Sequence, residues 1–461
     1  MITIEKIDEF ECRIIDPQGK RLIYEMLAYK KDKWVKNKYN KQKIEFDTSF
    51  LNKKTGKFPA GFLPRIISNL DRQKIPFELI DNQHNQVNFN KPHLPGIVFR
   101  PDQLELLEKV SRLHRGYLKS ATGTGKTLLA AGIHSMIDGR TLFLCHTIDL
   151  LVQAFETFRN FGFQAIMLGG GEKNLPNELD SRVIIVSTVQ TWIKIAFNSP
   201  DKYSEKFTAI IIDEVHHLSS QDSNYAKILE INLAPVRVGL TATDQTSSTS
   251  RMVLEAWVGP LIGEFTVEQG IKAGVLSEPQ IQWINVPDQQ EIYRLTNYRD
   301  IYKEAIIDSR IRNRLIIMEA IKETSQGKSV LILVKEVEHA KKLLEMADIL
   351  GLEINFVWSE TNKDERMKLK QALESKEKKC IIASTVWKEG VNIRSLDCVI
   401  NAAGGKSEIA TLQGIGRGLR ATTTKNKVII KDFIDTYKYL DHHTMMRLQV
   451  YVENKWEMRG I

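Results

Sequence analysis

Short apolar runs alternate with helix-like stretches along most of the chain, in two successive blocks. The runs of the first block are TLFLC, AIMLG, RVIIVS, AIIID and RVGLTAT, and those of the second are SVLILV, INFVW, KCIIAS, CVINAA and KVIIKDF. Because these runs lack the polar alternation of a half-exposed strand, they predict strands that are buried on both faces. Such strands, separated by helices, are typical of parallel sheets covered by helices. We therefore expect an α/β fold with two parallel-sheet lobes.

The domain organisation is predicted from the length of the chain and from a linker segment that contains proline and glycine. A chain of 461 residues is long enough for two or three domains. Its first ninety or so residues show the mixed strand and helix patterns of a small α+β domain, and KPHLPG at 91–96 reads as a linker. We expect an N-terminal accessory domain over 1–92, a first lobe over 93–262 and a second lobe over 263–461.

Composition excludes a membrane-spanning chain. No apolar run reaches the roughly 18–20 residues that a transmembrane helix needs, and the start MITIEKIDEFE is not a signal peptide. The four cysteines show no metal-binding spacing, which indicates reduced thiols. These features predict a cytoplasmic protein, in the host cytoplasm if the chain is viral.

The positive charge is concentrated near the N-terminus. The formal net charge is +8, and ten lysines lie between Lys30 and Lys57 against only three acidic residues. Trp34, Tyr39 and Phe46 are interleaved with them. Lysines on phosphates, with aromatic rings available for base stacking, would make a nucleic-acid surface. An ordinary solvated lysine face fits the same residues equally well.

The segment SATGTGKT at 120–127 lies between an apolar run and a helical stretch. This strand–loop–helix context is typical of a loop whose backbone N–H groups and helix N-terminus hold nucleotide phosphates. Lys126 would reach the β and γ phosphates, and the Thr127 hydroxyl would bind Mg²⁺. The loop residues expected to bind the nucleotide are Thr122, Gly123, Thr124, Gly125, Lys126 and Thr127. An ordinary glycine-rich turn is the alternative.

The segment DEVH begins at Asp213, where the run AIIID ends. A carboxylate at the end of a buried strand is where the metal-holding acid of such an ATPase lies. Asp213 would bind Mg²⁺ through water, and Glu214 would orient and deprotonate the attacking water. Acidic pairs at strand ends are common, and the ATPase interpretation depends on the preceding phosphate loop.

Two further segments stay ambiguous on local grounds. Thr241 and Thr243 end the next apolar run, where their hydroxyls could couple the nucleotide to a neighbouring lobe or simply cap the strand. Gln103 lies about twenty residues before the phosphate loop and could pair with an adenine edge. With Pro101 and Asp102 beside it, Gln103 also fits an ordinary helix N-terminus.

The segment QGIGRGLR at 413–420 follows the phosphate loop after almost three hundred residues. Arg417 and Arg420 are three positions apart and would share one face of a helix. Guanidinium groups aimed at a γ-phosphate accelerate its transfer by roughly 10³–10⁵. A nucleotide site split between two lobes would open and close during turnover, as in a motor. A surface pair of arginines is the alternative.

Taken in order, these motifs resemble those of the superfamily-two DExH helicases, over about residues 97–440. The matching segments are RPDQ, ATGTGKT, DEVH, GLTATD, STVWKEGVNI and QGIGRGLR, together with TLFLCHTIDLL, the GGG at 169–171 and VSTVQTW. Within that superfamily the chain is similar to phage UvsW-type recombination helicases, in which a small N-terminal domain precedes two RecA-like lobes. The segment 258–281 also resembles the lobe junction of DNA-directed members.

The resemblance implies roles for individual residues. The catalytic set would be Lys126, Asp213, Glu214, Arg417 and Arg420. The further nucleotide contacts would be Gln103 at the adenine, Arg100 near the base, and Gly390 and Gln413 beside the cleft. Nucleotide state would be linked to lobe closure by His216, Thr241 and Thr243. The nucleic-acid backbone would be contacted by Thr147, Gly170, Thr188, Gln190 and Thr385. Asn392 replaces an aspartate often found in this family.

The predicted function is that of a motor driven by ATP and Mg²⁺ that remodels branched DNA during recombination, repair and replication. Its expected partners are single-stranded and branched duplex DNA, RNA–DNA hybrids, and single-strand-binding or recombination proteins, without a membrane. Two alternatives stay open. One is a helicase that acts on RNA or on RNA–DNA hybrids, and the other is a nucleotide-gated clamp that binds nucleic acid without unwinding it.

Overall fold

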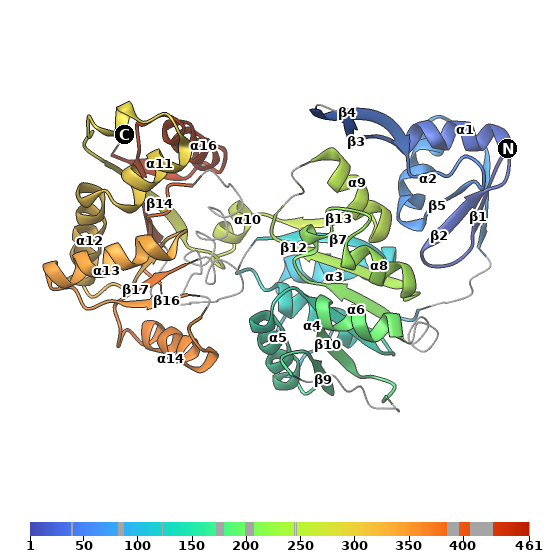
Figure 1. The fold of residues 1–461 in the computed structure, drawn as a ribbon. Helices are drawn as coiled ribbons and strands as arrows, with labels where there is room; N and C mark the ends of the chain where they lie inside the picture. Colours follow the sequence, from blue (N-terminus) through green and yellow to red (C-terminus); the bar gives the residue numbers. More distant parts are fainter. Residues whose placement is uncertain are drawn as a thin grey trace. The chain divides into compact units, whose positions relative to one another are not determined.

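The computed structural model of the chain contains two compact units (Figure 1). It describes residues 1–37, 40–81, 87–121, 123–171, 179–198, 207–243, 245, 247–358, 360–384, 396–405 and 427–460, without the side chains of 32–44 and 363. One unit holds residues 1–120 and 125–265, and the other holds residues 121–124 and 266–461. Across the described residues, no helix combines the length and the apolar character needed to cross a membrane.

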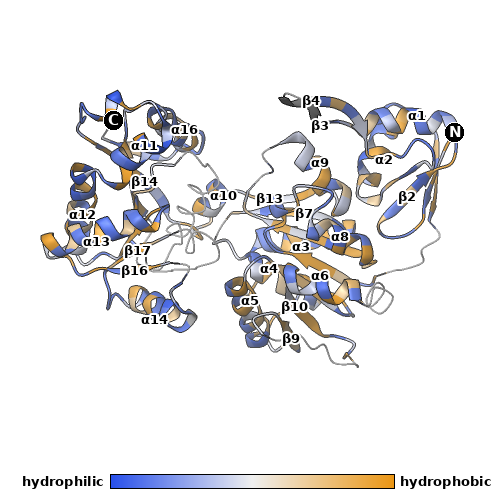
Figure 2. Ribbon diagram, in the orientation of Figure 1, coloured by the Kyte–Doolittle hydropathy of each residue, from blue (hydrophilic) through white to orange (hydrophobic). Residues whose placement is uncertain are grey.

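The first unit is built on a parallel sheet of seven strands. Its order is β13 (Leu261–Phe265), β7 (Arg115–Ser120), β12 (Val236–Thr241), β11 (Ala209–Ile212), β8 (Thr141–Cys145), β10 (Ile184–Thr188) and β9 (Ala165–Leu168). The central strands are buried along their whole length, because apolar cores lie on both faces. Figure 2 shows the apolar colouring of these strands.

Helices cover both faces of this sheet. One core joins the strands to α3 (Pro101–Leu113), α4 (Lys126–Met136) and α5 (Ile148–Asn160). The opposite core joins them to α6 (Val189–Asn198), α8 (Asn224–Ile231) and α9 (Ser248–Trp257). Connections of this kind place the carboxyl ends of all seven strands at one edge, where ligands bind in open α/β sheets.

The first 81 residues form a smaller α+β element. Its sheet has the order β5 (Lys57–Pro59), β2 (Glu11–Ile14), β1 (Ile2–Lys6) and β6 (Phe77–Asp81), with helices α1 (Pro17–Met26) and α2 (Leu63–Arg72). A separate antiparallel ribbon consists of β3 (Ala28–Asn37) and β4 (Asn40–Ser49). The ribbon and the loop after it hold the lysine-rich segment.

This N-terminal element shares a hydrophobic core with helix α9. The rings of Phe10 and Phe50 lie 5.8 and 6.2 Å from the ring of Trp257. A side chain at Gly61 would begin 2.0 Å from the Glu255 carbonyl oxygen, so only glycine allows this approach. Arg65 Nε donates a hydrogen bond to Glu255 Oε1 at 2.7 Å. The N-terminal element is therefore packed on the first sheet's unit rather than merely tethered to it.

The second unit is built on another parallel sheet of seven strands. Its order is β16 (Asn355–Val357), β17 (Cys380–Ala383), β15 (Val330–Leu333), β18 (Cys398–Asn401), β19 (Lys427–Ile434), β14 (Glu278–Asn285) and β20 (Glu457–Arg459). One face packs against α12 (Arg310–Thr324) and α13 (Val337–Leu350). The other packs against α14 (Lys363–Glu374).

The predicted fold class is confirmed: there are two parallel-sheet lobes and a small α+β element before them. Every apolar run predicted to be a strand is one, with ends that differ by a residue or two. Of the strands that the structure describes, six were not predicted, namely β13, β14 and β20 in the lobes, β5 in the N-terminal sheet, and both strands of the ribbon, β3 and β4. The exact division at residues 92 and 262 stays a prediction.

Candidate active site

The phosphate loop lies between the carboxyl end of β7 and the start of α4. Gly123 and Gly125 have φ angles of 88° and 103°, which lie in the left-handed region that side-chain-bearing residues rarely adopt. The Thr124 hydroxyl donates a hydrogen bond to the Ala121 carbonyl oxygen at 2.6 Å. The predicted strand–loop–helix context is present, and α4 points its N-terminus toward the loop. Thr122 lies outside the described residues.

Gln103 lies against this loop. It is almost fully buried in the first turn of α3, and a Cβ atom at Gly125 would stand 3.1 Å from its Nε2 atom. Its Oε1 atom accepts a hydrogen bond from the Arg100 N–H at 3.2 Å, so Gln103 also caps its own helix. The Arg100 guanidinium pairs with Asp102 at 2.8 Å and lies 5.5 Å from the Phe265 ring. The position of Gln103 is thus compatible both with an adenine contact and with an ordinary helix N-terminus.

The DEVH segment begins directly after β11. Asp213 is buried, and its N–H donates to the Leu144 carbonyl oxygen of the neighbouring strand at 2.8 Å. Glu214 has a φ of 48°, a left-handed conformation that is uncommon for a residue with a side chain. Its Oε1 atom lies 3.4 Å from Lys126 Nζ. The fold therefore brings Lys126, at the start of α4, close to the acidic pair.

The two carboxylates are shifted in opposite directions. Burial, and then the charge of Glu214, raise the pKa of Asp213 above its ordinary value. Burial would also raise the pKa of Glu214, but the Lys126 ammonium and His216 outweigh it and lower that pKa. Opposed shifts in a pair of neighbouring titratable groups are typical of catalytic sites.

His216 connects this acidic pair to the next strand. It lies in the short helix η2 (Val215–His217), and its Nδ1 atom is 3.4 Å from Glu214 Oε2 and 3.1 Å from Thr241 Oγ1. The Thr241 hydroxyl donates to the Thr243 carbonyl oxygen at 2.9 Å. The three predicted coupling residues are thus in one hydrogen-bonded group, in which Thr241 also closes the end of β12.

Sequence reasoning missed Gln245, a residue that braces this group. Its side-chain N–H donates to the carbonyl oxygens of His216 at 2.7 Å and Leu218 at 3.3 Å. It also missed a stack between His146 and His217, whose ring centroids are 4.2 Å apart. No local pattern marks these residues, because their contacts depend on which strands are neighbours.

The predicted nucleic-acid contacts of the first lobe gather at the carboxyl ends of β8, β9 and β10. The Thr147 hydroxyl oxygen accepts a hydrogen bond from the Leu150 N–H at 3.3 Å and caps α5. A Cβ atom at Gly169 would lie 3.5 Å from Thr188 Cγ2, and Gly170 has a φ of 63°. The side chain of Gln190 is exposed in the first turn of α6. These residues share an edge of the sheet with Asp213 and Glu214.

The remaining predicted residues lie outside the described part of the chain, so their roles stay predictions. They are Thr385, Gly390, Asn392, Gln413, Arg417 and Arg420.

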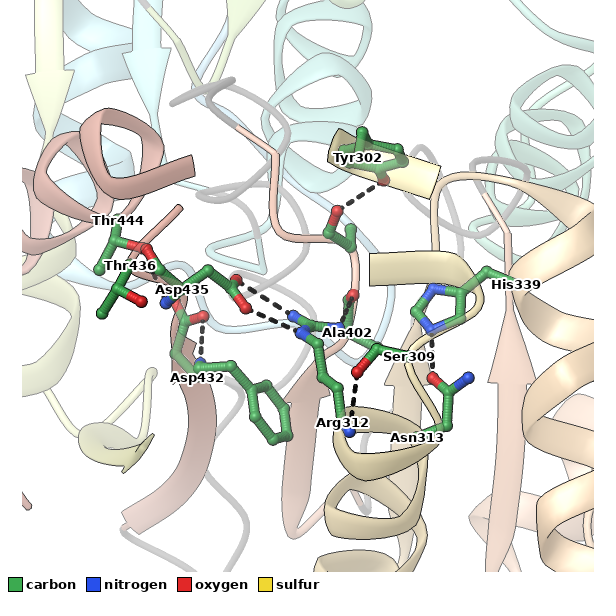
Figure 3. Close-up of polar contacts among 12 residues, drawn as sticks. Tyr302, Ser309, Arg312, Asn313, His339, Ala402, Asp432, Asp435, Thr436 and Thr444 are labelled. Carbon is green, nitrogen blue, oxygen red and sulfur yellow. Dashed lines mark hydrogen bonds and ion pairs between the residues drawn. The ribbon is translucent and has the colours of Figure 1, made fainter. Parts of the chain in front are cut away.

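The described residues that lead into the arginine segment are firmly held (Figure 3). After β18, the Ala402 carbonyl oxygen accepts a hydrogen bond from Arg312 at 2.8 Å, and the Ala403 carbonyl oxygen accepts one from the Tyr302 hydroxyl at 2.7 Å. Arg312 in turn pairs with Asp435 at 3.0 Å, and both are buried. A second buried pair joins Arg447 to Asp432 at 2.9 Å.

Comparison with known proteins agrees with these two lobes. Residues 96–246 match the family described as the res subunit of type III restriction enzymes, and residues 312–422 match the helicase conserved C-terminal domain. The chain is 26% identical to the DNA 3'-5' translocase XPB2 of Sulfurisphaera tokodaii over 359 residues, which cover 70% of this chain and 79% of the relative. It is 24% identical to the ATP-dependent DNA helicase uvsW of Enterobacteria phage T4 over 369 residues, or 74% and 72% of the two chains.

A solved structure supports the same fold. The ATP-dependent Type ISP restriction-modification enzyme LlaBIII bound to DNA superposes with a TM-score of 0.60 at 15% identity, over 84% of this chain and 32% of that one. The lobes are thus RecA-like, and both halves of a helicase core are present in the expected order. The chain therefore belongs to the superfamily-two helicases and is an ATP-dependent helicase.

Proposed function

We propose that this helicase is a DNA motor that remodels branched DNA by branch migration and fork regression, in recombination, repair and replication. The observation that carries the proposal is the contact between Lys126 and Glu214, 3.4 Å apart at the sheet edge that also carries the nucleic-acid candidates. The names of the two relatives favour DNA as the track, since one is a DNA translocase and the other a DNA helicase.

Lys126 and Glu214 are the residues that we propose for ATP hydrolysis. Lys126 would bind the β and γ phosphates, and Glu214 would orient and deprotonate the attacking water. The lowered pKa of Glu214 arises partly from Lys126, whose effect opposes that of burial. When Lys126 turns to the phosphates, Glu214 would lose that stabilising charge and become a stronger base. Arg417 and Arg420 are proposed as arginine fingers that stabilise the transferring phosphate, and Gln413 and Gly390 as further nucleotide contacts.

Asp213 and Thr127 fit Mg²⁺. A carboxylate and a hydroxyl are oxygen ligands of the kind that Mg²⁺ prefers. Burial disfavours the charged form of Asp213 and raises its pKa, a penalty that a cation would offset. Thr127 lies in the first turn of α4 and could bind the ion directly, with Asp213 acting through water. When bound, Mg²⁺ would neutralise charge on the transferring phosphoryl group.

Nucleic acid would be held mainly through its phosphates. The first-lobe contacts would come from Thr147, Gly170, Thr188 and Gln190, and Thr385 would add one from the second lobe. Hydroxyl and backbone contacts to phosphate carry no sequence information, so movement would be largely independent of sequence. The cytoplasmic location and the protein partners expected from the sequence stay predictions.

The lysine-rich ribbon is the proposed grip on duplex or junction DNA. Deleting the N-terminal element is a poor test, because Trp257 and the rest of the core that this element shares with the first lobe would become exposed. Charge reversal at the exposed residues Lys31 and Lys54 leaves that core intact. The K31E/K54E variant should bind four-way junctions roughly tenfold more weakly at 0.1 M salt. Its ATPase activity on single strands should be unchanged, and an unchanged junction affinity would refute the grip.

The central experiment is an ATPase and unwinding panel on single strands, forks, four-way junctions and RNA–DNA hybrids of one sequence. We expect the greatest unwinding on forks and junctions, and no turnover by Lys126→Ala on any substrate. Stimulation by RNA equal to that by DNA would favour the RNA-helicase alternative. Tight binding without turnover by the native chain would favour the clamp.

A further inference from the structure

Two histidines outside the predicted site join the nucleic-acid edge to the catalytic turn. His146 directly follows β8, and His217 ends η2, which follows β11. Because β8 and β11 are neighbours in the sheet, their carboxyl ends lie next to each other. The two imidazole rings are stacked, with centroids 4.2 Å apart and an angle of 16° between their planes.

Each histidine is one residue from a position with a predicted role. His146 precedes Thr147, the candidate nucleic-acid contact that caps α5. His217 follows His216, and those two rings are 4.4 Å apart. His216 in turn lies 3.4 Å from Glu214 Oε2. A continuous row of contacts therefore runs from the start of α5 to the carboxylate that would activate water.

The environment of the stack favours a packing role over a charged one. Burial, followed by His216 and His146, lowers the pKa of His217 to about 4, so this ring is neutral at physiological pH. Tyr225 is buried, and its hydroxyl lies 3.4 Å from His146 Nδ1, which fixes the orientation of that ring. In the described part of the chain, no group of three His, Cys, Asp or Glu residues is placed to hold a metal ion. Stacked rings also direct their nitrogen lone pairs away from each other's faces.

We propose that His146 and His217 are positioning residues through which nucleic acid bound at Thr147 stimulates ATP hydrolysis at Glu214. A shift of the segment that carries Thr147 would move the His146 ring, and the stacked His217 ring would carry that shift to the η2 turn. Dense packing transmits such displacements because it leaves no room for the rings to slide independently. The inference rests on the proposed function, since it requires hydrolysis that nucleic acid accelerates.

The test is the ratio of DNA-stimulated to basal kcat in the full-length chain, with a saturating single-stranded oligonucleotide as the probe. We expect His146→Ala and His217→Ala each to lower this ratio about tenfold. The Kd for the oligonucleotide and the KM for ATP should change less than twofold. The double variant should lose no more than either single variant, because the two rings act as one unit.

Two further variants separate stacking from other causes. His217→Phe keeps a flat ring in the stack and should restore most of the stimulation, while His93→Ala makes the same kind of change at an exposed histidine and should match the native chain. Thermal unfolding midpoints would show whether the variants stay folded, and His217→Phe provides the test if the alanine variants do not.

The possible outcomes are distinct. Stimulation that survives in both alanine variants would overturn the inference while leaving the proposed function intact. A loss in His217→Phe as large as that in His217→Ala would also overturn it, because the stacked ring would not be the cause. A native chain whose hydrolysis no nucleic acid accelerates would instead overturn the proposed function, and the inference with it.

Discussion

The carboxyl edges of both sheets carry buried acidic side chains next to basic ones, but the two edges differ in how closely these side chains are paired. In the first lobe, Glu214 lies 3.4 Å from Lys126 in a left-handed backbone conformation, and burial raises the pKa of Asp213. In the second lobe, Asp432 and Asp435 each pair with a buried arginine at about 3 Å, namely Arg447 at 2.9 Å and Arg312 at 3.0 Å.

The difference shows how one architecture serves either chemistry or structure. Carboxylates that are closely paired with arginines have little affinity left for a ligand, and they hold the backbone around them in place. A carboxylate whose burial is not offset, as at Asp213, destabilises the empty protein and favours the binding of a cation. The first edge therefore favours the binding of a ligand, and the second holds the backbone at the ends of β18 and β19 in place.

The largest expected effect would come from removing the proposed base. Glu214→Gln keeps the shape of the side chain but cannot accept a proton, so kcat for ATP should fall by roughly 10²–10⁴. Binding of a fluorescent ATP analogue should persist, because Lys126 and the phosphate loop remain. Turnover within tenfold of the native rate, measured by phosphate release, would place the chemistry elsewhere.

The same substitution at the second edge should affect folding instead. Asp432→Asn would weaken the pair with Arg447 and alter the acceptor of the Tyr451 hydroxyl, 2.7 Å away. Leaving a buried arginine without its partner costs about 3–5 kcal/mol, measurable by urea unfolding. The exposed Asp441→Asn is the control. If Asp432→Asn left the free energy of unfolding unchanged, the contrast between the two edges would not hold.

Asp213→Asn should raise the free energy of unfolding, whereas Asp432→Asn should lower it. Because the folded-state pKa of Asp213 is raised, its ionisation opposes folding above the unfolded-state pKa. Without Mg²⁺, in EDTA, the asparagine variant should therefore be more stable than the native chain by about 1 kcal/mol. Its advantage should grow between pH 5 and pH 8, and thermal melts across that range would show it. A loss of stability at pH 8 would contradict this account.

The smallest effect would test how the second edge holds the chain after β18. Tyr302→Phe removes only the hydroxyl that donates to the Ala403 carbonyl oxygen at 2.7 Å. The loss should be about 0.5–1.5 kcal/mol in unfolding free energy, with the KM for ATP unchanged. A rise in the KM for ATP without a matching loss in the free energy of unfolding would mean that this edge also takes part in nucleotide binding.

The sequence predicted the lobes well because their strands carry their own signal. Runs such as IIVST at β10 are apolar without interruption, as buried parallel strands require. The ribbon gave no such signal, since AYKKDKWVKN is dominated by lysine and its pairing with β4 depends on backbone hydrogen bonds. Strand β13 was missed because it is short and contains Gly263.

The site was predictable where chemistry is local and unpredictable where it depends on strand order. The phosphate loop and the acidic pair each form a recognisable segment, and a shared sheet edge is enough to expect them to meet. Gln245 and the pair of His146 and His217 have no such segment. Their contacts exist only because β8, β11 and β12 follow one another in the sheet, an order that no single stretch of sequence encodes.

The common core of the N-terminal element and the first lobe has a consequence for how the protein comes apart. A protease that cut the chain after the exposed Lys91 would break one covalent bond but none of the contacts among Phe10, Phe50 and Trp257. The two fragments would migrate together until a denaturant separated them. Grafting residues 1–81 onto another motor would accordingly require the outer surface of α9 to be carried across with them.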